Sequence, residues 1–329
     1  MAMTLTQYGY LSTDVLKKGI IQTILYDCPI LDRMPFIDIV GNSLLYNLES
    51  TAAGADFYAV GDVWKESTPT VEQRSVALTI LGGDADVDSF IEKTRSNVQD
   101  VEAAIIELKA KAIAQKFAKE LFFGGTGSVS AATANGFKGI TQLIAECESS
   151  TTTDLDHANN SQVINGGSAA DTAQALSLLA LDKLIDAIKP GKPDALMMSK
   201  GARRKLTSLC RVAGGSLDYT NKTTWGQQLE GYNGIPIFVN DWIPDTVDAT
   251  SSSALDVSAA SWVLGSSCSP IFALKFGENG FCGLQNGGID TETIGKLETK
   301  DARRTRIKWY CSVALFSIRA AAVLLNVTV

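Results

Sequence analysis

The sequence is poor in the side chains that most catalytic and metal centres need. It contains one histidine, His157, in the polar stretch TTTDLDHANN. A Ser–His–Asp or Cys–His centre requires a histidine held beside a nucleophile on a rigid scaffold, so we expect His157 to be a solvated surface residue. The six cysteines include no C-x-x-C pair, which argues against a zinc site or a redox motif. We therefore expect no metal site, no cofactor and no enzyme.

Long uninterrupted apolar segments are also missing. The most apolar stretch, Cys311–Val329, is interrupted by Arg319 and Asn326. An arginine at the centre of a membrane helix costs about 2.5–3.5 kcal/mol on insertion scales. The first ten residues, MAMTLTQYGY, have neither the basic segment nor the apolar segment of a signal peptide. These absences predict a soluble cytoplasmic protein that has no membrane partner.

The overall composition is that of a folded protein. Of its 329 residues, 45% are hydrophobic and 20% are charged, which is typical of globular chains rather than disordered ones. The net charge is −7. An acidic chain gains little from neutralising phosphates, so tight binding to bare DNA is not expected to be its main task.

Two short motifs resemble ligand sites only loosely. The stretch GGTGSVS follows a helical pattern rather than a strand and lacks the Gly-Lys-Ser/Thr of a phosphate loop. The stretch GGDADVD places three aspartates at the first ligand positions of a calcium loop. However, Ser89 stands where that loop needs glycine, and Arg95 stands where it needs a bidentate glutamate. Neither motif predicts a binding site.

The first third of the chain changes character twice. Residues 12–25 are typical of a short amphipathic helix, and Pro29 and Pro35 then predict an extended arm. Between residues 41 and 88, β-like runs separated by Gly, Thr and Pro predict a long, partly exposed hairpin.

A long helix is predicted over residues 89–123. Ser89 and Glu92 form a capping box, and glycines at 124 and 125 supply a stop. The predicted buried face contains Val98, Val101, Ile105, Leu108 and Ala112. At 1.5 Å per residue such a helix is on the order of 50 Å long.

The rest of the chain predicts a mixed region and a final β segment. Residues 135–290 contain a helix at 169–188, a strand in DALMMS, a helix in KGARRKLTSLCR that Ser199 can cap, and a hairpin around GIPIFVNDWIP. From Thr291 onward the pattern returns to β-like alternation.

In this order the parts resemble the major capsid protein of tailed bacteriophages, whose fold encapsulin shells share. The resemblance covers nearly the whole chain and depends on the order of the parts rather than on any single motif. It implies an α+β fold in five parts: an N-terminal arm at 1–40, an extended β-hairpin loop at 41–88, a peripheral domain with a long spine helix at 89–134, an axial domain at 135–290, and peripheral-domain return strands at 291–329.

The resemblance also implies a function and partners. The chain would be a structural subunit that self-assembles as hexamers and pentamers into an icosahedral shell, first a procapsid and then a head, around a double-stranded DNA genome. The arm begins within about ten residues of Met1, so a separate scaffolding protein is implied, together with a portal and possible decoration proteins. DNA would be packaged without sequence-specific binding. The location would be the virion capsid, assembled in the host cytoplasm.

Two other function classes stay open at this point. One is an encapsulin-type nanocompartment shell that encloses a protein cargo. The other is an α/β enzyme or small-molecule binding domain. Electron microscopy distinguishes an enzyme or binding domain from the two kinds of shell protein, because only the shell proteins form closed shells. The contents of the shell distinguish a phage head from an encapsulin.

Two sets of residues are candidates for subunit contacts. In RRTRIKWYCSV, basic residues alternate with Thr305, Ile307 and Trp309, as in a half-buried strand. We predict that this basic row faces an acidic row or equivalent carboxylates, within a subunit or across a contact, and that Asp86→Arg partly rescues Arg306→Asp. The alternative is a solvated basic face. The rows contain Arg304, Arg306 and Lys308, and Asp84, Asp86 and Asp88. The second set consists of Phe57, Tyr58 and Trp64 in the hairpin, which would be liabilities on an isolated chain.

Overall fold

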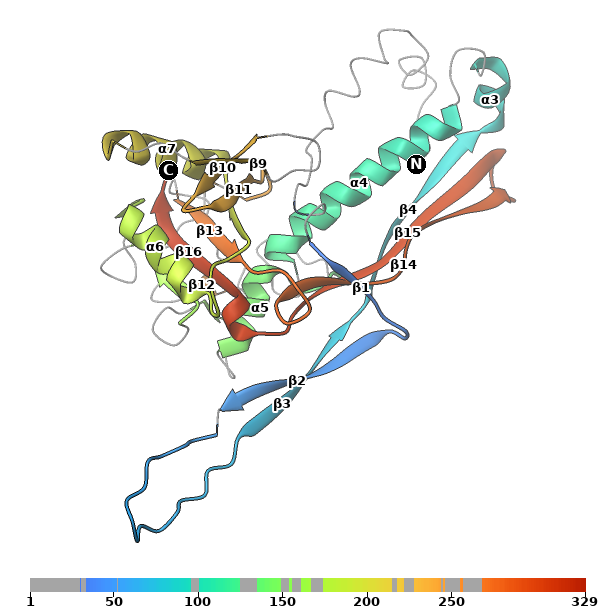
Figure 1. The fold of residues 1–329 in the computed structure, drawn as a ribbon. Coiled ribbons are helices and arrows are strands. Elements are labelled where there is room, and N and C mark those ends of the chain that lie inside the picture. Colours follow the sequence, from blue (N-terminus) through green and yellow to red (C-terminus); the bar gives the residue numbers. More distant parts are fainter. Residues whose placement is uncertain are drawn as a thin grey trace.

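The chain builds an elongated region and a compact region, each around its own β-sheet, and a hairpin projects from the elongated one (Figure 1). The computed structural model describes residues 30, 34–51, 53–95, 101–124, 135–148, 154–155, 161–166, 174–214, 218–221, 228–243, 245, 255–256 and 268–329. The predicted helix at 12–25 and His157 lie outside these residues.

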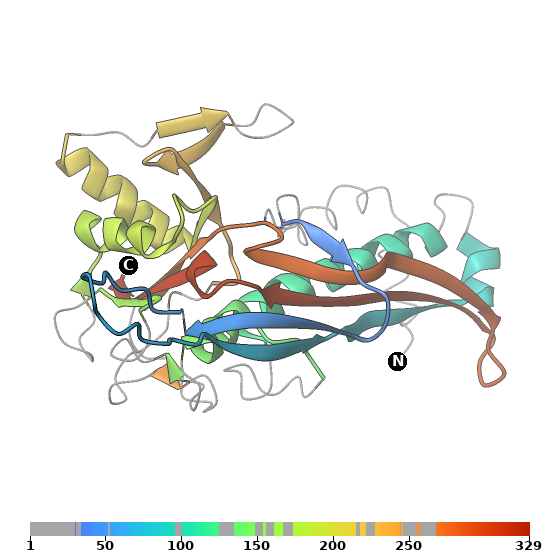
Figure 2. The same ribbon diagram turned by 60° about the horizontal axis from the view of Figure 1, so that its bottom comes forward.

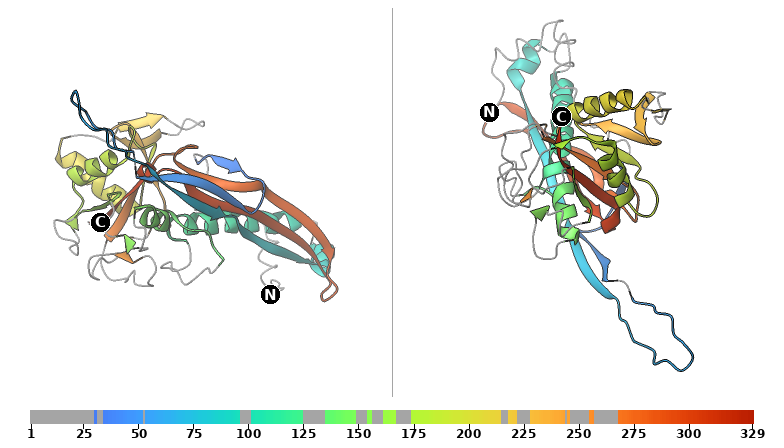
Figure 3. Two further views of the ribbon diagram at one scale, coloured as in Figure 1. Left: turned by 90° about the horizontal axis from the view of Figure 1, so that it is seen from below. Right: turned by 90° about the vertical axis from the view of Figure 1, so that its left-hand side faces the viewer.

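The elongated region is a four-stranded sheet in the order β1-β14-β15-β4. Strand β14 is antiparallel to β15, β15 is antiparallel to β4, and the short β1 is parallel to β14. The strands are β1 (Phe36–Asp38), β4 (Thr79–Asp88), β14 (Phe281–Lys296) and β15 (Ala302–Leu315). Seen from below, β14, β15 and α4 run alongside one another for most of the length of this region (Figure 3).

Alternation along β15 produces the two faces of this sheet. Thr305, Ile307 and Trp309 are buried, whereas the basic residues between them are half-buried or exposed. The buried face packs against helix α4 (Val101–Phe123), where the ring of Phe117 lies 4.8 Å from that of Trp309. The predicted half-buried strand is therefore confirmed.

The predicted single helix over residues 89–123 is wrong at its beginning. The chain forms a separate short helix, α3 (Ser89–Arg95), before α4. The predicted buried face is also only partly right, since Ala112 is exposed while Ile113 and Phe117 are buried. Because α4 packs against β4, β15 and α5 at once, its buried residues are set by three neighbours rather than by a single stripe.

The hairpin consists of β2 (Ser43–Thr51) and β3 (Thr70–Ala77), which form a two-stranded antiparallel sheet of their own. It extends away from both larger sheets (Figure 1). Figure 2 turns the bottom of that view forward, so that the hairpin is seen in front of the body. Only Leu78 separates β3 from β4. The range 41–88 therefore contains the projecting hairpin together with a strand of the four-stranded sheet.

The compact region is an eight-stranded sheet with helices packed against it. Its main order is β6-β16-β13-β8-β11-β10-β9, and β7 pairs with β16. The strands are β6 (Val163–Asn165), β7 (Gln174–Ala175), β8 (Ala195–Met198), β9 (Asp218–Asn221), β10 (Gln228–Tyr232), β11 (Ile235–Val239), β13 (Cys268–Leu274) and β16 (Ala321–Thr328).

Three α-helices and some short elements complete this description. They are α5 (Ile140–Glu148), α6 (Leu178–Ala187), α7 (Lys200–Val212), the 3-10 helix Ile318–Ala320, and the two-stranded pair β5 (Asp154–Leu155) and β12 (Leu255–Asp256). As predicted, the Ser199 side chain caps α7, accepting from the backbone N–H of Ala202 at 3.1 Å. Within the described residues, no helix combines the length and apolarity needed to span a membrane.

Strand pairing differs from the predicted division in the last part of the chain. Residues 291–329 were expected to be return strands of one domain, yet β16 pairs in the eight-stranded sheet. Strand β14 of the four-stranded sheet already begins at Phe281, inside the range predicted for the axial domain. The division into an arm and two domains itself stays a prediction.

Candidate functional site

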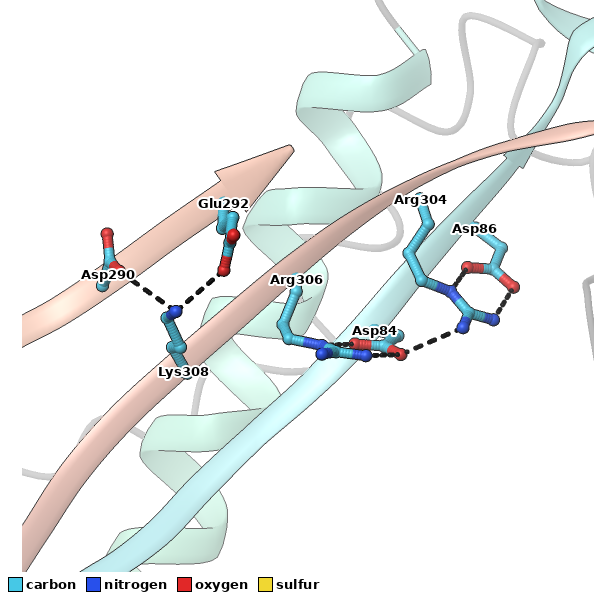
Figure 4. Close-up of polar contacts among 7 residues, drawn as sticks. All are labelled: Asp84, Asp86, Asp290, Glu292, Arg304, Arg306 and Lys308. Atoms are coloured by element: carbon cyan, nitrogen blue, oxygen red, sulfur yellow. Dashed lines mark hydrogen bonds and ion pairs between the residues drawn. The ribbon is translucent and has the colours of Figure 1, made fainter. Parts of the chain in front are cut away.

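Two strands place opposite charges face to face. Strands β4 and β15 pair so that Arg304 lies opposite Asp86 and Arg306 lies opposite Asp84. Each guanidinium holds its carboxylate through two hydrogen bonds, of 2.6 and 2.8 Å for Arg304 and of 2.7 and 3.1 Å for Arg306. Arg304 also reaches Asp84 at 3.4 Å. This bidentate geometry is the strongest form of ion pairing that these side chains can make (Figure 4).

The third basic residue of the row turns to the opposite neighbour. Lys308 lies opposite Gly82 on β4, which has no side chain to pair with. Its ammonium instead lies 2.8 Å from Glu292 and 3.6 Å from Asp290, both on β14 (Figure 4). The ion pairs thus cross three strands, and we call this set of seven residues the charge ladder: Asp84, Asp86, Asp290, Glu292, Arg304, Arg306 and Lys308.

Asp88 is not part of the charge ladder. It lies opposite Ala302, and its carboxylate accepts a hydrogen bond of 2.8 Å from the backbone N–H of Phe90. It therefore caps α3, a role that the sequence pattern assigned to Ser89. The Ser89 hydroxyl instead donates to the Asp301 carboxylate at 2.9 Å.

The ion pairs lower the pKa values of carboxylates in the charge ladder. The hydrogen bond from Arg306 holds the pKa of Asp84 below its ordinary value, and the hydrogen bond from Arg304 does the same to the pKa of Asp86. On β14, the hydrogen bond from Lys308 lowers the pKa of Glu292. The ladder carboxylates with lowered pKa values are therefore ionised at neutral pH, each held by its cation.

Two carboxylates of the aspartate run are already engaged by cations of the same chain. The carboxylate oxygens of Asp84 and Asp86 already accept hydrogen bonds from guanidinium groups. Among the residues that the structure describes, no group of three or more His, Cys, Asp or Glu side chains is arranged to hold a metal ion.

The aromatic candidates lie at the far end of the hairpin. All residues from 53 to 69 except Tyr58 are exposed. The rings of Tyr58 and Trp64 stack with their centroids 4.4 Å apart, and the side chain of Phe57 is fully exposed. Val60 and Val63 are similarly uncovered. The tip therefore exposes several large apolar side chains, interspersed with charged residues such as Asp56 and Asp62.

Sequence reasoning missed Asp290 and Glu292. Their signal was available, because the run DTET spaces two carboxylates as the aspartates of β4 are spaced. What it lacked was the bulge between Gln285 and Ile289, which sets the register that brings Glu292 within reach of Lys308. The role of both candidate sets as subunit contacts stays a prediction.

The sequence matches no family model and no curated protein sequence. Comparison of the fold is decisive. An encapsulin in the holo-SrpI complex of Synechococcus elongatus aligns over 100% of this chain and 97% of its own, with a TM-score of 0.68 at 16% identity.

Viral-type capsids align in the same way. A chain from the capsid of a native GTA particle has a TM-score of 0.62 at 13% identity, covering 91% of this chain and 90% of its own. A chain from the capsid of cyanophage P-SCSP1u has a TM-score of 0.53 at 13% identity, covering 89% and 86%. The chain has the tailed-phage capsid fold.

The predicted fold class is therefore confirmed, and the fold gives the candidate surfaces a context. In this tailed-phage capsid fold the charge ladder lies on the sheet face opposite the buried side chains of β15, and the apolar tip lies at the end of the hairpin. The ladder satisfies its own charges within one chain, whereas the tip has no comparable cover in the described part of the chain.

Proposed function

We propose that this chain is a major capsid protein, a structural subunit that self-assembles into an icosahedral shell, procapsid and then head, around a double-stranded DNA genome. The observation that carries the proposal is an alignment of nearly the whole chain with subunits of capsids and of an encapsulin. The alignment with the encapsulin covers 100% of this chain, so it includes both sheets and the hairpin, which supports a shell role.

The exposed hairpin supports this function. An isolated soluble protein gains nothing from a tip on which Phe57, Val60 and Trp64 are all exposed, because such a patch promotes aggregation. The same tip becomes stabilising when a neighbouring subunit covers it. We infer that Phe57, Tyr58 and Trp64 are subunit contacts.

The charge distribution supports a container rather than a nucleic-acid binder. Three cations of β15 are already paired with carboxylates of the same chain, and the net charge is −7. DNA would therefore be packaged without sequence-specific binding. The proposal includes hexamers and pentamers of this chain, a scaffolding protein, a portal and possible decoration proteins, with a virion location after assembly in the host cytoplasm.

A second candidate is an encapsulin-type shell around a protein cargo. The observation that favours it is the TM-score of 0.68 to an encapsulin over 100% of this chain. Both candidates require closed shells and differ in what the shells contain.

The test is electron microscopy of the purified full-length protein, produced alone and with its neighbouring genes. We expect closed shells of uniform size that protect DNA from nuclease when the packaging genes are present. Shells that retain a defined protein and no DNA would favour the encapsulin. A protein that remains monomeric under all of these conditions would rule out both.

A further inference from the structure

The base of the hairpin is attached to the body by one of its two faces. Strands β2 and β3 pair only with one another among the described strands, so no sheet ladder joins them to the four-stranded sheet. On one face, Leu44, Leu48 and Val76 are buried or half-buried, while Leu45 and Asn47 on the other face are exposed. Side-chain contacts of the first face therefore hold the hairpin in its direction.

A directly opposed pair lies at the centre of that face. Tyr46 on β2 pairs in register with Arg74 on β3. The Tyr46 hydroxyl donates to the carbonyl oxygen of Leu315 at 3.1 Å, and its ring packs edge-on against Phe316 with centroids 4.9 Å apart. One strand of the hairpin is thereby fixed to the end of β15.

The other strand is fixed to a helix. The Arg74 guanidinium donates to the backbone carbonyl oxygen of Glu146 at 2.8 Å, in the last turn of α5. Carbonyl groups at a helix C-terminus lack intrahelical partners and carry partial negative charge, so a permanently charged guanidinium suits this place. Helix α5 is itself joined to α4, since the Thr141 hydroxyl donates to the carbonyl of Phe122 at 2.8 Å.

Besides Tyr46 and Arg74, the apolar residues of this face hold the base of the hairpin, since Leu44 and Val76 pack against the cluster of Ile39, Cys282, Leu284 and Ala314. Within the described residues, the remaining links to the body are the two backbone connections. On the β2 side the chain passes through Val40 and Gly41, both exposed. Gly41 has a φ of +108°, and a Cβ atom at this position would have no neighbour within 4 Å. On the β3 side only Leu78 separates the hairpin from β4. Two single backbone connections resist bending far less than a hydrogen-bonded sheet does.

We propose that Tyr46 and Arg74 form an anchor pair that sets the direction of the hairpin, so that the apolar tip meets its partner at a fixed place. They are positioning residues. The contact of the tip with a partner rests on the proposed shell function, whereas the fixed direction of the hairpin does not. From Tyr46 to Val60 the chain spans at most about 50 Å, so a tilt of about 10° at the base moves the tip by up to about 9 Å. That displacement exceeds the tolerance of a packed interface.

The direction can be measured in the unassembled full-length chain by electron–electron double resonance. One spin label is attached to a cysteine that replaces Glu66 near the tip, and the other to a cysteine that replaces Lys119 on α4. Both positions are exposed. The four cysteines whose side chains the structure describes are buried, and Cys28 and Cys147 are replaced by serine. The variants are Arg74→Ala, Tyr46→Phe and their combination, with Arg74→Lys as the conservative replacement.

We expect a single narrow distance distribution for the parent chain and one at least about twice as broad for the double variant. Arg74→Lys should be narrower than Arg74→Ala, because it returns a cation to the helix end. Asn47→Ala on the exposed face of β2 and Arg211→Ala on α7 are matched controls and should leave the distribution unchanged.

A double variant whose distribution coincides with that of the parent overturns the anchor pair, and so does broadening by the controls to the same extent. A separate experiment tests assembly. If the double variant broadens the distribution, its shells should be irregular or several-fold fewer. If the parent chain forms no shells at all, the proposed function fails while the distance measurement still decides the anchor.

Discussion

Strands β3 and β4 follow one another with one residue between them, yet they end in opposite environments. Every second residue of β4 toward its end, including Ala85 and Val87, is buried beneath α4. Strand β3 joins a hairpin whose far end is exposed on all sides. Both strands obey the same alternation. The difference is the cover, which α4 supplies to one strand and which no described residue supplies to the tip.

The comparison predicts that equally large aromatic residues contribute to different states of the protein. Phe117 is fully buried among Phe36, Phe137 and Trp309, so Phe117→Ala should lower the free energy of unfolding of the subunit by about 3–5 kcal/mol. Trp64 is 79% exposed, so Trp64→Ala should change the free energy of unfolding by less than about 0.5 kcal/mol.

Chemical denaturation of unassembled chains measures both free energies of unfolding. Sedimentation measures the yield of shells, and thus the effect of each substitution on assembly. Trp64→Ala should reduce the yield of shells although the subunit stays folded. Full yield from that variant would show that the tip is not a contact surface.

Two adjacent glycines of β4 sharpen the comparison within the covered region. A Cβ atom at Gly82 would lie 2.5 Å from the carbonyl oxygen of Ile307, so Gly82→Ala must push β4 away from β15. At Gly83 the nearest atom is 3.8 Å away, at the flexible end of Lys109. We expect Gly82→Ala to destabilise the chain by about 1–3 kcal/mol in urea titrations and Gly83→Ala to be nearly neutral. Equal effects would contradict the close approach.

The charge ladder tests whether the covered sheet also takes part in assembly. Arg306→Asp places two carboxylates opposite one another and should reduce shell yield several-fold, most strongly at low salt. The strand register gives Asp84, rather than Asp86, as the partner. Asp84→Arg should therefore restore assembly of Arg306→Asp better than Asp86→Arg does. Normal assembly of the single variant at both high and low salt would leave the ladder a purely local feature.

The smallest expected effect is that of pH. The pKa values of Asp84 and Asp86 are lowered in the folded chain, so their ion pairs stabilise it fully above the unfolded-state pKa of about 4. This contribution is lost as the pH falls through the lower folded-state values. Between pH 5 and pH 3 the urea midpoint of the parent should therefore fall slightly more than that of the Asp84→Asn, Asp86→Asn variant. Identical falls would show that the ladder contributes nothing to acid stability.

The charge ladder illustrates how far the sequence reaches. Two-residue spacing was enough to predict that Arg304 and Arg306 share a face, because side chains alternate along any strand. The prediction that Asp84 and Asp86 could oppose them also needed the resemblance, which placed both segments in one domain. Spacing could not assign Asp88 to the cap of α3 or Lys308 to β14. Those choices depend on register and on the bulges of β14, which residue spacing does not determine.

The order of the parts, the alternation of β15 and the apolar content of the hairpin were determined by the sequence itself, because they arise from local spacing and composition. Only the tertiary structure decided that α3 and α4 are separate helices, that β16 joins the eight-stranded sheet, and that the side chains of Tyr46 and Arg74 hold the hairpin. These features depend on contacts between residues tens to hundreds of positions apart. Such contacts are selected by how whole elements pack, and no local pattern encodes them.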